Sequence, residues 1–281
     1  MSVIVATSLA EAFAALSAHP EATLVAGGTD VMVEVNAGHR HVADVVMVNR
    51  VGELCTWRHD GAMLHLGAGV TWSQIEAAPI AEWVPVLAQA ARTVGSPQIR
   101  HVGTIGGNLG TCSPAGDGLP GLAALDAVVH LASPAGERSL PFAEFMVGPK
   151  RTARVAGELI IGVTVPVLRG WQGYSKVGVR NAMVIATASV ALVTDLDGRT
   201  VRLALGSVGP TILRCTEAEA FAAANVDFAN GAASAAVVSE FAALARAAAR
   251  PIDDHRSTAE YRRHAVGVLA GRLLRRAFPN E

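Results

Sequence analysis

Two glycine-rich segments carry residues that could bind an anionic ligand through the main chain. The first segment is Val25-Ala26-Gly27-Gly28-Thr29-Asp30. Because two adjacent glycines leave several backbone N–H groups uncovered, such a turn can form a nest for anionic oxygens. The hydroxyl of Thr29 adds a donor, and the carboxylate of Asp30 could accept a hydrogen bond from a ribose or an amide. A tight turn that needs a positive φ angle at one glycine explains the same residues.

The second segment runs from Thr104 to Asp117 and again pairs adjacent glycines with hydroxyl and amide side chains. We expect a loop here, within a stretch from 95 to 120 that is dense in glycine and proline. The segment has no lysine, and neither the GxxxxGK[ST] nor the GxGxxG nucleotide motif is present. Main-chain amides from both turns would then converge on one diphosphate, as in a dinucleotide cofactor. Asp117 is either the acceptor for a ribose hydroxyl or a helix N-cap.

Together the two segments resemble the paired FAD signature of the flavoprotein (medium) subunit of the molybdenum hydroxylases. That family includes the carbon-monoxide dehydrogenase medium subunit and the flavin domain of xanthine dehydrogenase. The resemblance extends over nearly the whole chain, because further matches follow in order. They are Ser96 to Gly103, Phe145 with Gly148 and Thr152, Glu158-Leu159-Ile160, Tyr174-Ser175-Lys176 with Arg180, and Ala259 to His264.

The resemblance implies that FAD is the cofactor and that this chain has no catalytic residue and no metal ligand. It places Asp117 on the adenosine side, and Ile161 and Lys176 near the isoalloxazine. On chemistry alone, Lys176 could stabilise negative charge on the reduced flavin, or it could be a solvated surface lysine. The implied cofactor-binding positions are Val25, Ala26, Gly27, Gly28, Thr29, Asp30, Thr104, Ile105, Gly107, Asn108, Thr111, Asp117, Ile161 and Lys176.

Small residues mark three departures from the family pattern. Gly110 and Cys112 stand where alanine is common, and Gly118 stands where a larger residue is common. We expect these changes to leave the main-chain nest intact but to loosen the loop. At Asn181-Ala182-Met183-Val184, relatives commonly have an acidic residue, and the sequence does not indicate what its loss changes.

Local patterns predict the elements that must position these residues. Ser8 to Glu11 reads as a capping box that opens a helix, and Asp60-Gly61 and Asp197-Gly198 suit hairpin turns. Strands and hairpins are expected at 23–26, 44–48, 54–66, 158–165 and 184–208, and helices from Ser8, from Thr71, at 83–93, 217–224, 232–249 and 259–277.

The expected fold class is α+β. As the resemblance implies, a two-lobed FAD-binding domain of the vanillyl-alcohol-oxidase/PCMH type should occupy 1–172, with lobes at about 1–53 and 54–172. A smaller α+β domain with an antiparallel sheet and helices should occupy 173–281.

Composition limits the possible classes of function. The chain is 51% hydrophobic and 17% charged, which favours a folded protein, and its net charge of −1 gives no reason to expect nucleic-acid binding. The apolar runs are shorter than the roughly 20 residues that span a bilayer, and no secretory signal is evident, so we expect a cytoplasmic protein. Three separated cysteines do not suggest a disulfide framework, a zinc site or an iron–sulfur cluster.

Other residues are weaker candidates. Cys112 is expected to be a small buried spacer rather than a reactive thiol, and the four tryptophans to lie in the core or at interfaces. The arginine-rich end should be a solvated helix face or a surface for a partner; it comprises Arg262, Arg263, Arg272, Arg275 and Arg276.

Three functions remain open at this stage. The first, favoured by the resemblance, is an electron-transfer subunit that passes electrons from a small [2Fe–2S] subunit through FAD to an external acceptor. A large molybdopterin subunit would complete the complex, as a dimer of heterotrimers. The second is a self-contained flavin oxidase or reductase, for which only Tyr174 and Lys176 are candidate acid or base groups. The third is a non-catalytic assembly protein whose glycine segments are simple turns.

Overall fold

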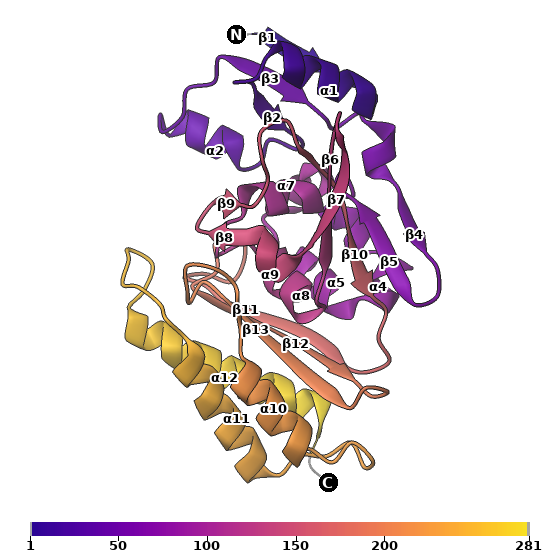
Figure 1. The fold of residues 1–281 in the computed structure, drawn as a ribbon. Helices are drawn as coiled ribbons and strands as arrows, with labels where there is room; N and C mark the ends of the chain where they lie inside the picture. Colours follow the sequence, from indigo (N-terminus) through magenta and orange to yellow (C-terminus); the bar gives the residue numbers. More distant parts are fainter. Residues whose placement is uncertain (1, 280–281) are drawn as a thin grey trace.

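The computed structural model describes residues 2–279, and the chain forms three layers stacked from the N-terminus to the C-terminus (Figure 1). The first layer is a parallel sheet in the order β1-β3-β2. As predicted, Ser8 caps the first helix, because its hydroxyl accepts a hydrogen bond of 3.2 Å from the Glu11 amide. The elements of this layer are β1 (Ser2–Val5), α1 (Leu9–Ala18), β2 (Thr23–Val25), α2 (Val31–Asn36) and β3 (Asp44–Met47).

The middle layer is an antiparallel sheet in the order β4-β5-β10-β6-β7. The predicted hairpin at Asp60-Gly61 is confirmed, with a φ angle of +91° at Gly61, and β10 ends at Pro166, one residue beyond the strand predicted at 158–165. The elements of this layer are η1 (Gly52–Cys55), β4 (Trp57–His59), β5 (Met63–Gly67), α3 (Trp72–Ile75), α4 (Ile80–Trp83), α5 (Pro85–Thr93), β6 (Val128–Ser133), β7 (Gly136–Pro141), α9 (Phe142–Phe145), β8 (Met146–Gly148), β9 (Arg151–Thr152) and β10 (Leu159–Pro166).

The long loop predicted at 95–120 is wrong, because most of this stretch is helical. It contains α6 (Pro97–Val102) and α7 (Ile105–Thr111), and it runs into α8 (Gly118–Ala124). Ser96 and Thr104 supply the N-caps of α6 and α7. Every residue of α8 is buried. Capping and burial therefore overcome the poor helix propensity of the glycines.

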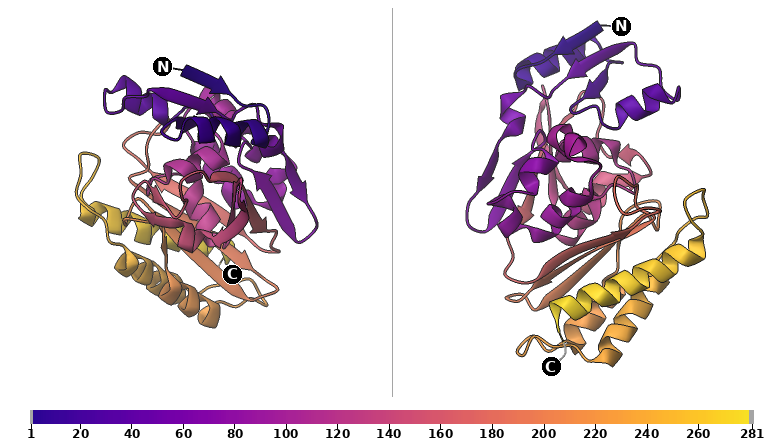
Figure 2. Two further views of the ribbon diagram at one scale, coloured as in Figure 1. Left: turned by 45° about the horizontal axis from the view of Figure 1, so that its top comes forward. Right: turned by 180° about the vertical axis from the view of Figure 1, so that it is seen from behind.

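The third layer is an antiparallel sheet in the order β11-β12-β13-β14. One face of this sheet contacts α5 and α8 of the middle layer, and helices cover the other face (Figures 1 and 2). The hairpin at Asp197-Gly198 is confirmed, but its first strand begins at Ala188 rather than at 184. The elements of this layer are β11 (Gln172–Val177), β12 (Ala188–Asp195), β13 (Thr200–Gly206), β14 (Leu213–Arg214), α10 (Thr216–Asn225), α11 (Ala235–Ala248) and α12 (Ala259–Ala277).

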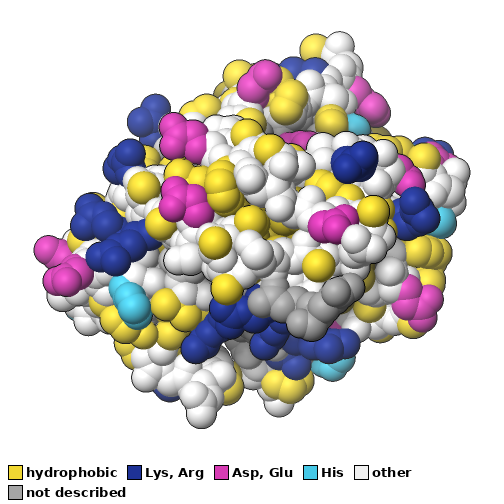
Figure 3. Space-filling view, turned by 90° about the horizontal axis from the view of Figure 1, so that it is seen from below, with side chains coloured by type: hydrophobic (Ala, Val, Ile, Leu, Met, Phe, Trp, Pro, Cys, Tyr) yellow, Lys and Arg dark blue, Asp and Glu magenta, His cyan; other side chains and the backbone are white. Residues whose placement is uncertain are grey.

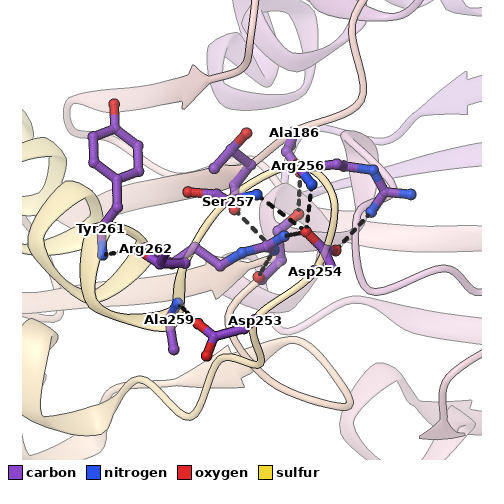
Figure 4. A network of polar contacts seen from close by, with 11 residues as sticks. Ala186, Asp253, Asp254, Arg256, Ser257, Ala259, Tyr261 and Arg262 are labelled. Atoms are coloured by element: carbon purple, nitrogen blue, oxygen red, sulfur yellow. Dashed lines mark hydrogen bonds and ion pairs between the residues drawn. The ribbon is translucent and has the colours of Figure 1, made fainter.

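The prediction of a solvated arginine face on the last helix is wrong for Arg262, which is 3% exposed. Its guanidinium donates to the carbonyl oxygens of Thr187 (3.1 Å) and Ser207 (2.8 Å). It also donates to the Asp254 carboxylate at 2.6 Å, within the polar network of Figure 4. Arg262 therefore fastens α12 to the ends of the third sheet. The exposed arginines of this helix are Arg272, Arg275 and Arg276, and Figure 3 shows basic side chains grouped on this side of the molecule.

Candidate functional site

The first glycine loop joins β2 to α2 and keeps its main-chain donors free. Among residues 2–279, no acceptor is found for the amides of residues 27 to 30. Gly28 has a φ angle of +71°, so the turn interpretation of this glycine also holds. A run of uncommitted amides at the start of a helix is the arrangement that binds anionic oxygens.

This loop lies directly against the junction of α6 and α7. A Cβ atom at Gly27 would lie 1.9 Å from the carbonyl oxygen of Val102, so only glycine permits the contact. The Thr111 hydroxyl, at the end of α7, donates to the Asp30 carboxylate at 3.3 Å. The structure therefore brings together the two segments that the sequence separates.

The second segment differs from the prediction of a main-chain nest. A Cβ atom at Gly106 would lie 2.6 Å from the Ala68 carbonyl oxygen, so α7 packs tightly against the turn after β5. The first amides of α7 already donate hydrogen bonds to this turn and to the helix's own N-cap. The Ile105 side chain is fully buried. The bonds run from Ile105 to the Val70 carbonyl (3.0 Å), from Gly106 to the Ala68 carbonyl (2.9 Å) and from Gly107 to the Thr104 hydroxyl (2.9 Å).

Asn108 is the group of this segment that is left without a partner. Its Oδ1 atom is buried, and it accepts no hydrogen bond from any of residues 2–279. The amide group is enclosed by two glycines, since a Cβ atom at Gly116 would lie 2.7 Å from Nδ2 and one at Gly118 would lie 2.9 Å from Oδ1. A buried acceptor without a donor is costly, so a ligand or water molecule that donates to this oxygen would be stabilised.

Asp117 and Lys176 form an ion pair between the second and third layers. The Lys176 ammonium donates to Asp117 at 2.7 Å and to the carbonyl oxygens of Thr93 (2.9 Å) and Val184 (3.0 Å). The Lys176 side chain is 9% exposed, so the interpretation as a surface lysine is wrong. All three of its donors are used, and donation to a flavin would require one of these bonds to exchange.

Tyr174 completes this buried group. Its hydroxyl donates to the other carboxylate oxygen of Asp117 at 3.0 Å. Burial raises the pKa of the Asp117 carboxyl, and the contacts with Lys176 and Tyr174 partly offset that rise. Asp117 precedes α8, as the N-cap interpretation required, but its side chain makes no capping bond. The pair instead joins two layers of the fold.

A cleft of about 670 Å³ opens beside the ion pair. The turn between α5 and α6 lines one side, and residues between 174 and 184 line the other. Arg180 donates to the carbonyl oxygens of Ala182 and Met183, so the segment that departs from the family pattern forms a closed turn.

Ile161 is not among the residues that line this cleft. It sits at an irregularity of β10 between Ile160 and Gly162, and its carbonyl oxygen accepts a hydrogen bond of 3.0 Å from the Ala68 amide. The Ala68 carbonyl oxygen in turn accepts a hydrogen bond from the Gly106 amide. Ala68 therefore links Ile161 to the start of α7 through two main-chain hydrogen bonds. Such bulges are frequent beside functional sites.

Cys112 is fully buried at the end of α7, with a φ angle of +49°. Burial raises the pKa of its thiol to about 11, and that of Cys215 to about 12. We expect iodoacetamide at about pH 8 to modify the partly exposed Cys55 while both buried thiols stay intact, as peptide mass spectrometry can measure. All three cysteines should react once the chain is unfolded in urea. If Cys112 in the folded protein were labelled as fast as Cys55, its assignment as a buried spacer would be wrong.

Trp72 is a residue of the site for which the sequence indicated only a place in the core or at an interface. It is 3% exposed, and its ring fills the space that Gly118 leaves, since a Cβ atom at Gly118 would lie 2.3 Å from Cη2. The expectation that Gly118 loosens this region is therefore wrong. The helix predicted from Thr71 is confirmed and begins with a capping box between Thr71 and Gln74, but no local pattern pairs position 72 with position 118.

Comparisons with known proteins agree over nearly the whole chain. Residues 1–168 match the family described as "FAD binding domain in molybdopterin dehydrogenase", and residues 174–277 match "CO dehydrogenase flavoprotein C-terminal domain". The glyceraldehyde dehydrogenase medium chain of Sulfolobus acidocaldarius is 32% identical over 95% of each chain. The putative xanthine dehydrogenase FAD-binding subunit XdhB of Escherichia coli is 33% identical over 76% of each.

A solved structure has the same fold. The chain superimposes on a carbon monoxide dehydrogenase structure from Hydrogenophaga pseudoflava with a TM-score of 0.88, at 29% identity, over 99% of this chain and 96% of that one. The α+β fold class is thereby confirmed. None of the helices within residues 2–279 has the length and apolar character needed to span a membrane.

Proposed function

Because this chain belongs to the FAD-binding medium subunits of the molybdenum hydroxylase family, we propose that its first glycine loop and α7 hold FAD between them. The observation that carries this proposal is the set of free amides at residues 27–30, in a loop packed against the α6–α7 junction, together with the unpartnered oxygen of Asn108 on α7. Phosphate oxygens only accept hydrogen bonds, so the amides suit the pyrophosphate. Asn108 Oδ1 is also an acceptor, so it suits a ribityl or ribose hydroxyl rather than a phosphate.

We propose that the chain serves as the electron-transfer subunit of a dehydrogenase complex. Bound FAD supplies the redox chemistry, since it can take up electrons singly and release them in pairs. We assign the electron-donating centre to a small [2Fe–2S] subunit and the substrate chemistry to a large molybdopterin subunit, in a dimer of heterotrimers in the cytoplasm. The proposed boundary between the FAD-binding and C-terminal domains lies at 172/173, close to the start of β11.

The geometry gives little support to a self-contained oxidase. Burial raises the pKa of the Tyr174 hydroxyl well above its usual range, and this hydroxyl already donates to Asp117. All three donors of Lys176 are likewise taken. Neither group is poised to exchange a proton with a substrate near neutral pH.

The visible spectrum of the purified full-length chain tests the proposal. We expect a flavin spectrum with about one FAD per chain. Co-purification with subunits that carry iron and molybdenum would support the proposed complex. Bleaching of the flavin by a substrate in the isolated chain would favour a self-contained oxidase, and a colourless chain that takes up no added FAD would overturn the assignment.

Asn108→Ala should weaken FAD binding by about 10- to 100-fold, because it removes the acceptor that the proposed hydroxyl would use. Cys112→Ala is the matched control at the end of the same helix, and it should change binding less than about threefold. Titration of the FAD-free proteins, followed by flavin fluorescence, measures both effects. Equal affinities in the two variants would show that Asn108 does not contact the cofactor.

A further inference from the structure

The ring of Trp72 occupies a gap in the wall around Asn108. Its Cη2 atom would be 2.3 Å from a Cβ atom at Gly118, and Asn108 Oδ1 would be 2.9 Å from the same point. The ring edge and the amide oxygen therefore flank one missing side chain. Since Oδ1 has no hydrogen-bond partner within residues 2–279, packing is what orients it.

Trp72 is also attached to the main chain that leads into α7. Its amide donates to the Gly103 carbonyl oxygen at 3.1 Å, and its Cδ1 atom would be 3.3 Å from a Cβ atom at Gly103. Its neighbour Thr71 forms a β-bridge with Thr104, the cap of α7. One buried ring therefore touches both the entry to α7 and the start of α8.

We propose that Trp72 is a positioning residue for the cofactor, which holds Asn108 in place by filling the space of the absent side chain at Gly118. This inference rests on the proposed function, because Asn108 is taken to bind FAD. It predicts that positions 72 and 118 are energetically coupled, so that a smaller ring at 72 makes room for a Cβ atom at 118.

A double-mutant cycle on the full-length chain tests the coupling, with FAD affinity measured by flavin fluorescence and the bound flavin followed by visible circular dichroism. Gly118→Ala should weaken FAD binding by about 30-fold, because the new Cβ atom displaces the ring and the Asn108 amide. Trp72→Phe alone should weaken binding by about fivefold, because it leaves a cavity beside the amide. The double variant should bind FAD at least about fivefold more tightly than Gly118→Ala alone, with a flavin dichroism closer to that of wild type.

Trp83→Phe is the matched control, because Trp83 stacks on His59 with ring centroids 4.1 Å apart and is not in the wall around Asn108. It should leave both the affinity and the flavin dichroism unchanged. If Gly118→Ala does not fold, a loss of affinity in Trp72→Phe but not in Trp83→Phe supports the proposal, and equal effects overturn it. The proposal is also overturned if the loss of FAD affinity in the double variant equals the product of the losses in the two single variants. A wild-type chain that binds no FAD would instead refute the proposed function.

Discussion

Gly27→Ala is expected to reduce FAD retention by more than about tenfold. The added Cβ atom would lie 1.9 Å from the Val102 carbonyl oxygen, which is main chain and cannot rotate away. The loop must then move off the α6–α7 junction, and its free amides would move with it. FAD content per chain after gel filtration measures the effect.

Gly110→Ala is the control for this prediction. Gly110 is an exposed glycine of α7, and a Cβ atom there would make only an ordinary contact of 3.8 Å with Ile160. Because alanine favours the helix, this variant should be more stable by about 0.5–1 kcal/mol and keep its FAD. If Gly27→Ala retained as much FAD as Gly110→Ala, contact between the loop and the junction would not be needed for binding.

Lys176→Met is expected to lower the free energy of unfolding by about 3–5 kcal/mol near pH 7, because it leaves the Asp117 carboxylate buried without its cation. Adding Asp117→Asn should recover most of the loss, since the buried charge is then gone. Lys150→Met is the control: Lys150 pairs with Glu34 but its side chain is 53% exposed, so the cost should stay below about 1 kcal/mol. Urea unfolding of the FAD-free chains measures all three.

The loss in Lys176→Met should also depend on pH. Burial raises the folded-state pKa of Asp117 and Lys176 opposes that rise, so in Lys176→Met the folded-state pKa should lie still further above that of the unfolded chain. The difference in unfolding free energy between Lys176→Met and wild type should therefore shrink as the pH falls through the folded-state pKa of Asp117 in the variant. It should be smallest below the unfolded-state pKa of about 3.9. A difference that stays constant across this range would show that Asp117 carries no buried charge.

Features set by neighbouring residues could be predicted from the sequence. The cap at Ser8, the hairpin at Asp60-Gly61 and the end of β10 at Pro166 each depend on local backbone preferences. The free amides of the first glycine loop are of the same kind, because adjacent glycines leave them uncovered.

Features set by contacts between distant residues could not be predicted. The glycines of α7 argue against a helix, and the close packing of Gly106 on Ala68, added to the Thr104 cap, explains why a helix forms there. Lys176 and Arg262 look like solvated cations in the sequence, yet each is buried against carbonyl oxygens of other elements. Burial of a cation depends on where distant acceptors lie, and no short window contains that information.

Hydrogen exchange of the first glycine loop, with and without FAD, tests the central claim most directly. The amides of residues 27–30 have no acceptor within the described chain, so they should exchange fast without FAD. We predict that saturating FAD slows their exchange by at least about tenfold, while exchange of the Ala135 amide in the β6–β7 turn is unaffected. Unchanged exchange of residues 27–30 in a chain with bound flavin would contradict the claim that these amides hold the pyrophosphate.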